Sequence, residues 1–233
     1  RLVSESEGTK TTIGNSGIPK LEGQIFDLVY YLEYDLKGRL TRKFSAGQGR
    51  SWFVYDRYDR QILSQNEAMR GAGKWNFVKF DEFGRQILSG IWNSSQSPSS
   101  VQDQLDNQEV ENPAGVSTLW ETFVGKSTNH LFGYTSFAFP QSDFDVLAVH
   151  YFDTYDLDKD GERDFAFSSN ASDLDPTHFT TLHSPLFDNL NGLPTISRSV
   201  TLDGVSSIED QTWKTDVVFY NKDLQVIQTR HFE

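Results

Sequence analysis

Short runs of hydrophobic, often aromatic, residues alternate with polar turn residues along most of this chain. From Ile25 onward, strand-like runs occupy residues 26–32, 40–44, 52–55, 61–64, 75–80, 86–92, 118–123, 131–137, 146–151, 216–220 and 225–231. Runs of this length, separated by Gly, Asp and Asn, are typical of strands in an antiparallel sheet. Because Phe, Tyr, Trp and β-branched residues suit a pleated surface, the pattern predicts an all-β fold built from successive antiparallel hairpins.

Three segments depart from this pattern. Residues 1–22 are polar and lack periodicity, which predicts an N-terminal linker or arm, and residues 23–233 form the β-sheet region. Two loop-like insertions, at about 93–117 and 168–195, interrupt that region, and a short helix is expected at Val101–Glu109 within the first.

One short pattern occurs three times at the ends of these runs. An aromatic residue and Asp are followed by two variable residues, then Gly or Asp, then Arg, and an aliphatic residue closes the pattern. The copies start at residues 34, 55 and 80, which are 21 and 25 residues apart. The repeat residues are Tyr34, Asp35, Gly38, Arg39, Tyr55, Asp56, Asp59, Arg60, Phe80, Asp81, Gly84 and Arg85. A repeat of this period usually marks stacked supersecondary units.

Each copy of the repeat is predicted to be the turn of a hairpin. A short carboxylate at the Asp position bonds backbone N–H groups two residues further on, and Gly or Asp accepts the positive φ that such a loop needs. The Arg of each copy is expected to bridge neighbouring turns. A degenerate fourth copy follows Tyr220, with Asn221 in the Asp position, Leu224 in the Gly position and Gln225 in the Arg position.

This repeat resembles the YD repeats of Rhs-type bacterial proteins. The elements around the copies, at residues 27–31, 74–81 and 147–156, resemble those of large YD-repeat surface proteins exported by the type IX system. The resemblance covers roughly residues 23–233. It implies a long antiparallel sheet that spirals into a hollow shell, which in family members often encloses a C-terminal toxin and in others serves adhesion. It also implies a secreted or cell-surface location, with the remainder of a longer chain, an enclosed cargo and the export machinery as partners.

The composition of the chain argues against several classes of function. The net charge of −12 argues against a general nucleic-acid or anionic-membrane binder. The chain has no cysteine, which excludes disulfides and thiol chemistry. No apolar run approaches the ~18 residues of a membrane helix, so no membrane insertion is expected.

The sharpest chemical motif is an acidic loop. Its carboxylates belong to Asp156, Asp158, Asp160, Glu162 and Asp164, with Gly161 at the tight turn. Alternating oxygen ligands followed by Gly are what a calcium ion requires, so calcium is the predicted cofactor. The loop departs from an EF-hand because Phe167 stands where a bidentate Glu would be expected. The alternative is a solvated acidic turn.

No catalytic constellation emerges, and the chain is not expected to be an enzyme. Its five histidines are scattered along the sequence. The tryptophans are expected in the sheet core, with a carbohydrate platform as the alternative. We therefore expect a shell or scaffold fragment. The alternatives are an adhesin that contacts a glycan or partner through the two insertions, and cargo bound to an export or surface machine.

Overall fold

The structure is a computed structural model that describes residues 12–13, 19–20, 30–126, 132–168, 190–201 and 212–232. It contains twelve strands and two short helices in these residues. In chain order the elements are β1 (Thr12–Ile13), β2 (Pro19–Lys20), β3 (Tyr31–Tyr34), β4 (Leu40–Ser45), β5 (Gly49–Tyr55), β6 (Gln61–Asn66), α1 (Glu67–Gly71), β7 (Lys74–Phe80), β8 (Gln86–Asn93), α2 (Pro98–Asp106), β9 (Phe144–Phe152), β10 (Pro194–Val200), β11 (Trp213–Tyr220) and β12 (Val226–Phe232).

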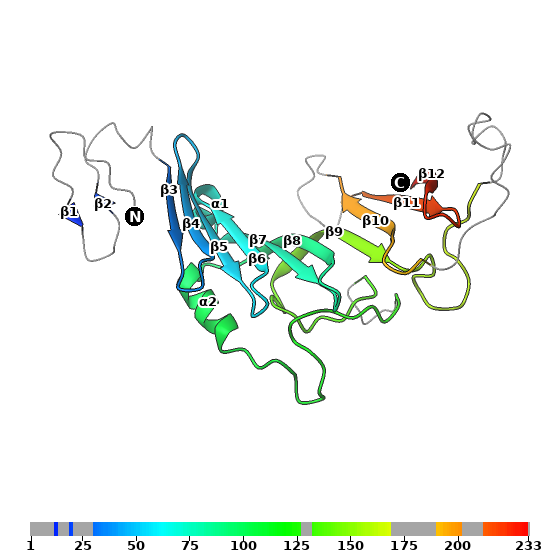
Figure 1. The fold of residues 1–233 in the computed structure, drawn as a ribbon, viewed down its shortest axis with the longest axis horizontal. Coiled ribbons are helices and arrows are strands. Elements are labelled where there is room, and N and C mark those ends of the chain that lie inside the picture. The colour runs from blue at the N-terminus through cyan, green and yellow to red at the C-terminus, as the bar shows by residue number, and fades with distance from the viewer. Residues whose placement is uncertain are drawn as a thin grey trace. The chain divides into compact units, whose positions relative to one another are not determined.

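The all-β prediction is confirmed. Strands β3 to β12 follow chain order in one antiparallel sheet of ten strands, and β3 and β12 are its two ends, so the sheet does not close on itself. Successive strands carry the colours of Figure 1 in order from blue to red. Such a meander is the architecture that repeated hairpins produce, because each strand pairs with the strands before and after it.

Two of the predicted strands are wrong. Residues 118–123 and 132–137 lie in irregular loops whose only ladder contact in the described chain is an isolated bridge between Phe123 and Tyr134. Their apolar side chains are instead used to cover the sheet. The helix in the first insertion is present, but it begins at Pro98, three residues before the predicted start, because Ser97 caps it: the Ser97 hydroxyl accepts from the backbone N–H of Ser100 at 3.1 Å.

The chain divides into two compact units, residues 1–52 and 53–233. In the first unit, β1 pairs with β2 inside the segment predicted as an arm, and β3 pairs with β4. An ion pair joins Glu33 on β3 to Arg42 on β4, its partner in the register. Tyr30, Leu32, Tyr34 and Leu36 are large hydrophobic residues that lie exposed in this unit.

Part of the core of the second unit lies on one face of strands β6 to β9. Alternation along β7 buries Trp75 and Phe77, and the neighbouring strands add Leu63, Leu88 and Val149, all at most 1% exposed. A period of two buries every second side chain, as the sequence pattern requires. Trp75 and Trp92 are both buried, which places these two rings in the core and not on a surface platform.

The first insertion covers this core. Val101 and Leu105 of α2 are buried, and α2 lies beside β5 (Figure 1), where the Gln102 side-chain amide bonds both backbone groups of Tyr55. Gly90 on β8 permits a close approach of the strands, since a Cβ there would lie 1.9 Å from the carbonyl oxygen of Asp145 on β9. The insertion and the strands thus form one packed body in the second unit.

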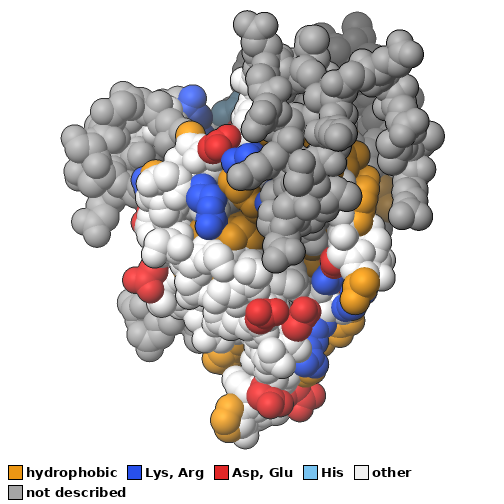
Figure 2. Space-filling view, turned by 90° about the vertical axis from the view of Figure 1, so that its left-hand side faces the viewer, with side chains coloured by type: hydrophobic (Ala, Val, Ile, Leu, Met, Phe, Trp, Pro, Cys, Tyr) orange, Lys and Arg blue, Asp and Glu red, His pale blue; other side chains and the backbone are white. Residues whose placement is uncertain are grey.

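Charged side chains of both signs lie close together on the face shown in Figure 2, with hydrophobic side chains exposed among them. No helix in the described residues is both long and apolar enough to cross a membrane.

Candidate functional site

The turn between β7 and β8 shows how the repeat residues are used. One carboxylate oxygen of Asp81, Oδ1, accepts from the backbone N–H groups of Phe83 (3.0 Å) and Arg85 (2.8 Å). The other, Oδ2, accepts from Nε of Arg85 at 2.6 Å. The backbone closes the same turn, because the Asp81 N–H donates to the Arg85 carbonyl and the Gly84 N–H to the Asp81 carbonyl, both at 3.0 Å. Gly84 has a φ of +76°, as the repeat predicts.

This arrangement, which we call the Asp–Arg clamp, recurs in the other two copies. In the turn between β5 and β6, Asp56 Oδ1 accepts from the N–H groups of Tyr58 and Arg60 at 2.9 Å, and its Oδ2 accepts from Arg60 Nε at 2.7 Å. Asp35 and Arg39 form the same contacts between β3 and β4, with an Nε–Oδ2 distance of 2.6 Å. Asp59 takes the Gly position with a φ of +59°.

The degenerate fourth copy keeps the geometry and loses the charge. Asn221 Oδ1 accepts from the backbone N–H groups of Asp223 (3.0 Å) and Gln225 (2.9 Å), and Asn221 Nδ2 donates to Gln225 Oε1 at 3.1 Å. Leu224 adopts a φ of +61° where the other copies have Gly or Asp. The turn therefore depends on one side-chain oxygen that accepts two N–H groups, and the ion pair is an addition.

Two of the arginines also reach beyond their own turns. Arg60 Nη2 donates to the Leu119 carbonyl at 2.8 Å, and Arg85 Nη1 pairs at 2.8 Å with Asp153, the residue after β9. Each Arg thus binds the Asp of its own turn, and Arg85 also binds Asp153, which lies outside the copies of the repeat. Burial lowers the pKa of Arg85, but hydrogen bonds and charge from the two carboxylates outweigh this effect and leave the pKa raised.

The Asp35 carboxyl shows the electrostatic result of a clamp. Partial desolvation raises its pKa, but the backbone N–H groups of Arg39 and Lys37 and the Arg39 guanidinium hydrogen-bond the charged form. The pKa of Asp35 is therefore below its ordinary value.

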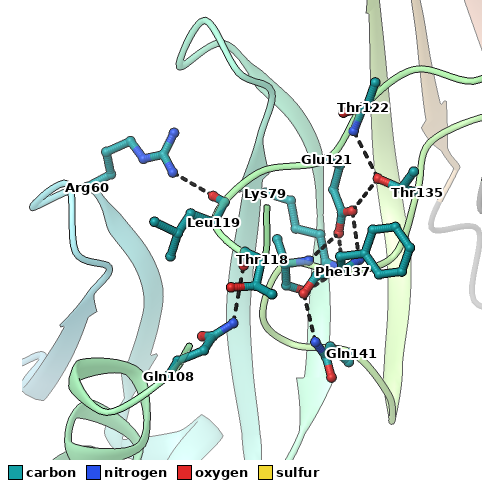
Figure 3. Close-up of polar contacts among 11 residues, drawn as sticks. Arg60, Lys79, Gln108, Thr118, Leu119, Glu121, Thr122, Thr135, Phe137 and Gln141 are labelled. Atoms are coloured by element: carbon teal, nitrogen blue, oxygen red, sulfur yellow. Dashed lines mark hydrogen bonds and ion pairs between the residues drawn. The ribbon is translucent and has the colours of Figure 1, made fainter. Parts of the chain in front are cut away.

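A buried ion pair joins β7 to the loop around Glu121, in the second unit. Lys79 Nζ is 2.8 Å from Glu121 Oε1, and both side chains are 0% exposed. Figure 3 shows Glu121 directed toward Lys79, Thr135 and Phe137. Its two oxygens also accept from the Thr135 hydroxyl (2.8 Å) and from the backbone N–H groups of Phe137 (2.9 Å) and Ala138 (3.0 Å).

Each charge in this pair has several partners, as a buried ion requires. Lys79 also donates to the Ala138 carbonyl at 3.0 Å and lies 4.8 Å from the centre of the Phe144 ring. Burial lowers the pKa of Lys79, and the charge and hydrogen bond of Glu121 oppose that shift without cancelling it. The pair fastens residues 118–126 and 132–138, which we call the covering loop, to β7.

Three of the five predicted metal ligands converge. One carboxylate oxygen from each of Asp156, Asp158 and Asp164 lies within 4.8 Å of the others, while Asp160 and Glu162 are outside this group. Backbone donors bond Asp156 within the loop: its Oδ1 accepts from the Lys159 N–H at 2.6 Å and its Oδ2 from the Gly161 N–H at 2.9 Å. A cluster of hard oxygen ligands of this kind fits a calcium ion.

The carboxylates in this loop repel one another. The Asp160 N–H lowers the pKa of Asp158, but partial desolvation, the charges of Asp160 and Asp164 and a hydrogen bond to Asp156 together raise the pKa above its ordinary value. A bound cation would relieve this repulsion.

Two histidines can be placed. Burial lowers the pKa of His150 on β9, and His231 Nδ1 lies 2.5 Å from Asp216 Oδ1. His130, His178 and His183, together with most of the second insertion, lie outside the described residues.

Sequence reasoning missed Lys79 and Glu121. Lys79 carries a signal, since it follows Trp75 and Phe77 on the apolar face of β7. Glu121 carries none, because it lies in an irregular loop and its partner is 42 residues away.

Comparison with known proteins finds weak likenesses to solved structures. No family model matches the chain, and no curated protein matches it. A structure entitled TcdB2-TccC3 without hypervariable C-terminal region has a TM-score of 0.23 at 13% identity, covering 87% of this chain and 9% of that one. A second, TcdB2-TccC3-TEV, has a TM-score of 0.22 at 12% identity, covering 88% and 9%. The chain thus spans about a tenth of the length of the solved chains that it is similar to.

Proposed function

We propose that this chain is a non-enzymatic wall segment of a secreted or cell-surface YD-repeat protein. The observation that carries the proposal is the recurrence of one turn geometry in four hairpins, at Asp35, Asp56, Asp81 and Asn221. In each turn the side chain of the Asp or Asn accepts hydrogen bonds from backbone N–H groups of the same turn. A repeat whose Asp or Asn side chain bonds within its own turn uses that side chain to extend a sheet.

In this proposal the wall belongs to a longer chain and encloses a toxin or other cargo during export. The buried Lys79–Glu121 pair supports a rigid wall, because it joins the loop around Glu121 to β7 through two side chains that are both 0% exposed.

Enclosure can be tested by limited trypsin digestion of the longest natural form of the protein that contains these residues. The wild type should protect a segment outside residues 1–233. A variant with Asp56→Ala and Asp81→Ala should expose it, because both turns lose the acceptor of two N–H groups. The exposed Glu109→Ala variant is the control. Equal digestion of the enclosed segment in all three proteins would contradict the proposal.

We also propose that the acidic loop binds calcium, through Asp156, Asp158 and Asp164 with Asp160 and Glu162 nearby. The convergence of three carboxylates supports this second function. Calorimetric titration with calcium chloride should show one site in the wild type and none in Asp158→Asn. Asp223→Asn removes an exposed carboxylate from another turn and should bind normally. No heat from the wild type, or an unchanged melting temperature with chelator, would rule calcium out.

A further inference from the structure

A pocket of about 220 Å³ opens beside the turn between β7 and β8, in the second unit. Three phenylalanine rings line it: Phe83 from the turn, Phe123 from the loop after α2, and Phe152 from the end of β9. Phe83 is 72% exposed, although an aromatic ring of this size is normally buried. The pocket therefore offers aromatic surface to solvent at a concave position.

Arg85 holds two of these rings in place. The Arg85 guanidinium carbon lies 4.9 Å from the centre of the Phe83 ring and 4.3 Å from that of Phe152. The same guanidinium pairs with Asp81 at 2.6 Å and with Asp153 at 2.8 Å. Its charge is already neutralised, so Arg85 orients the rings and is not itself a binding group for an anion.

The rim of the pocket carries an acidic side chain, a basic side chain and a hydroxyl group. Glu82, Thr122 and Lys159 line the pocket and are exposed. Within the described part of the chain the side chains of Glu82 and Thr122 have no hydrogen-bond partner. Lys159 Nζ donates to the Phe123 carbonyl at 3.0 Å, which leaves two of its three N–H donors. A ligand here meets the Glu82 carboxylate and the two remaining N–H donors of Lys159, so the rim suits a ligand that both donates and accepts hydrogen bonds.

We propose that this pocket binds one or two rings of a neutral carbohydrate. The C–H groups on one face of a pyranose carry partial positive charge and pack on the negative face of an aromatic ring, as Phe83 presents it. Its hydroxyls can donate to Glu82 and accept from Lys159 and Thr122. An apolar ligand would leave these rim groups desolvated and unpaired. The proposal adds recognition to the scaffold function and does not rest on it.

Saturation-transfer NMR of the full chain tests the pocket. The probes are the methyl glycosides of glucose, galactose, mannose and N-acetylglucosamine and their β1,4-linked disaccharides. The wild type should transfer saturation to the ring protons of at least one probe. Phe83→Ala should weaken that binding about tenfold and Glu82→Gln about threefold, as the loss of one aromatic contact and one charged acceptor implies.

Tyr58→Ala is the matched control, because Tyr58 has the same repeat position as Phe83, is 57% exposed and does not line the pocket. It should bind as the wild type does, and circular dichroism should show all variants folded. No transfer to any probe, equal binding by Phe83→Ala and the wild type, or tighter binding of glucosamine or glucuronate than of the neutral sugars would overturn the proposal. Failure here leaves the digestion test of the wall unaffected.

Discussion

The Asp–Arg clamps and the Lys79–Glu121 pair are both ion pairs, but they stabilise the sheet in different ways. In a clamp the partners are four residues apart and partly exposed, with side-chain exposures of 22% for Arg85 and 9% for Asp81. In the buried pair the partners are 42 residues apart and fully enclosed. A clamp defines a local turn and can be repeated along the chain. The buried pair fixes one long-range contact, and its cost of desolvation makes it sensitive to the loss of either partner.

Removal of Lys79 is expected to have the largest effect. In Lys79→Met the Glu121 carboxylate stays buried with its three neutral donors and without a counter-charge. The free energy of unfolding should fall by about 3–5 kcal/mol, the usual cost of breaking a buried pair on one side. Urea denaturation followed by tryptophan fluorescence measures this change.

The control for this prediction lies on the same strand. Lys74→Met makes the same chemical change at an exposed position of β7 and should alter stability by less than about 0.5 kcal/mol. If the two variants have the same midpoint, the pair does not fasten the loop as proposed.

Removal of the side-chain oxygen from one turn is expected to rank second. Asp81→Ala leaves the N–H groups of Phe83 and Arg85 without their acceptor, and it leaves Arg85 with Asp153 alone. The loss should be about 2 kcal/mol, the upper end for a lost capping oxygen. Thermal melting should show a decrease of roughly 4–8 °C if unfolding of the second unit is two-state.

Conversion of one clamp to the uncharged form should cost less. The double variant Asp81→Asn with Arg85→Gln copies the Asn221–Gln225 turn, which keeps both backbone hydrogen bonds. A loss of about 1 kcal/mol is expected, since only the charged contacts to Arg85 disappear. The reverse double variant, Asn221→Asp with Gln225→Arg, should be as stable as the wild type or slightly more so. A loss as large as that of Asp81→Ala would mean that the ion pair, and not the shared oxygen, forms the turn.

These two kinds of contact also explain what could be predicted from the sequence. The strands around the repeat were predictable because Asp, Gly and Arg recur at fixed spacing and each residue acts on its own turn. The strands predicted at 118–123 and 131–137 were wrong because their apolar residues cover the sheet, and alternation alone does not distinguish a covering loop from a strand. The meeting of Asp156, Asp158 and Asp164 follows from local spacing. The pocket at Phe83 does not, because it joins a turn, a loop and a strand end through tertiary packing.

The last expected effect is confined to alkaline pH and concerns a second set of contacts that fasten the covering loop. The Tyr151 hydroxyl on β9 donates to the Phe132 carbonyl at 3.0 Å, and the Tyr134 hydroxyl donates to the His150 carbonyl at 2.8 Å. Burial raises the pKa of Tyr151 to about 12, an effect that the charge and hydrogen bond of Arg198 only partly oppose. The folded state therefore retains a proton that the unfolded state loses near pH 10.

This contribution to stability is complete below pH 10 and is lost as the pH rises through about 12. Stability measured by urea denaturation should fall more steeply between pH 10 and 12 in the wild type than in Tyr151→Phe. The opposite contribution of Lys79, whose pKa is lowered, is present in both proteins and cancels in the difference. Tyr155→Phe is the comparison, because Tyr155 also has a pKa raised to about 12 by burial but bonds the Val218 carbonyl on β11, away from the covering loop. Both variants should flatten the pH profile, but only Tyr151→Phe should increase proteolysis of the loop at neutral pH. If neither variant flattens the pH profile, burial of the two phenols does not stabilise the folded state between pH 10 and 12. The Lys79–Glu121 pair would then be the main contact that attaches the covering loop to the sheet.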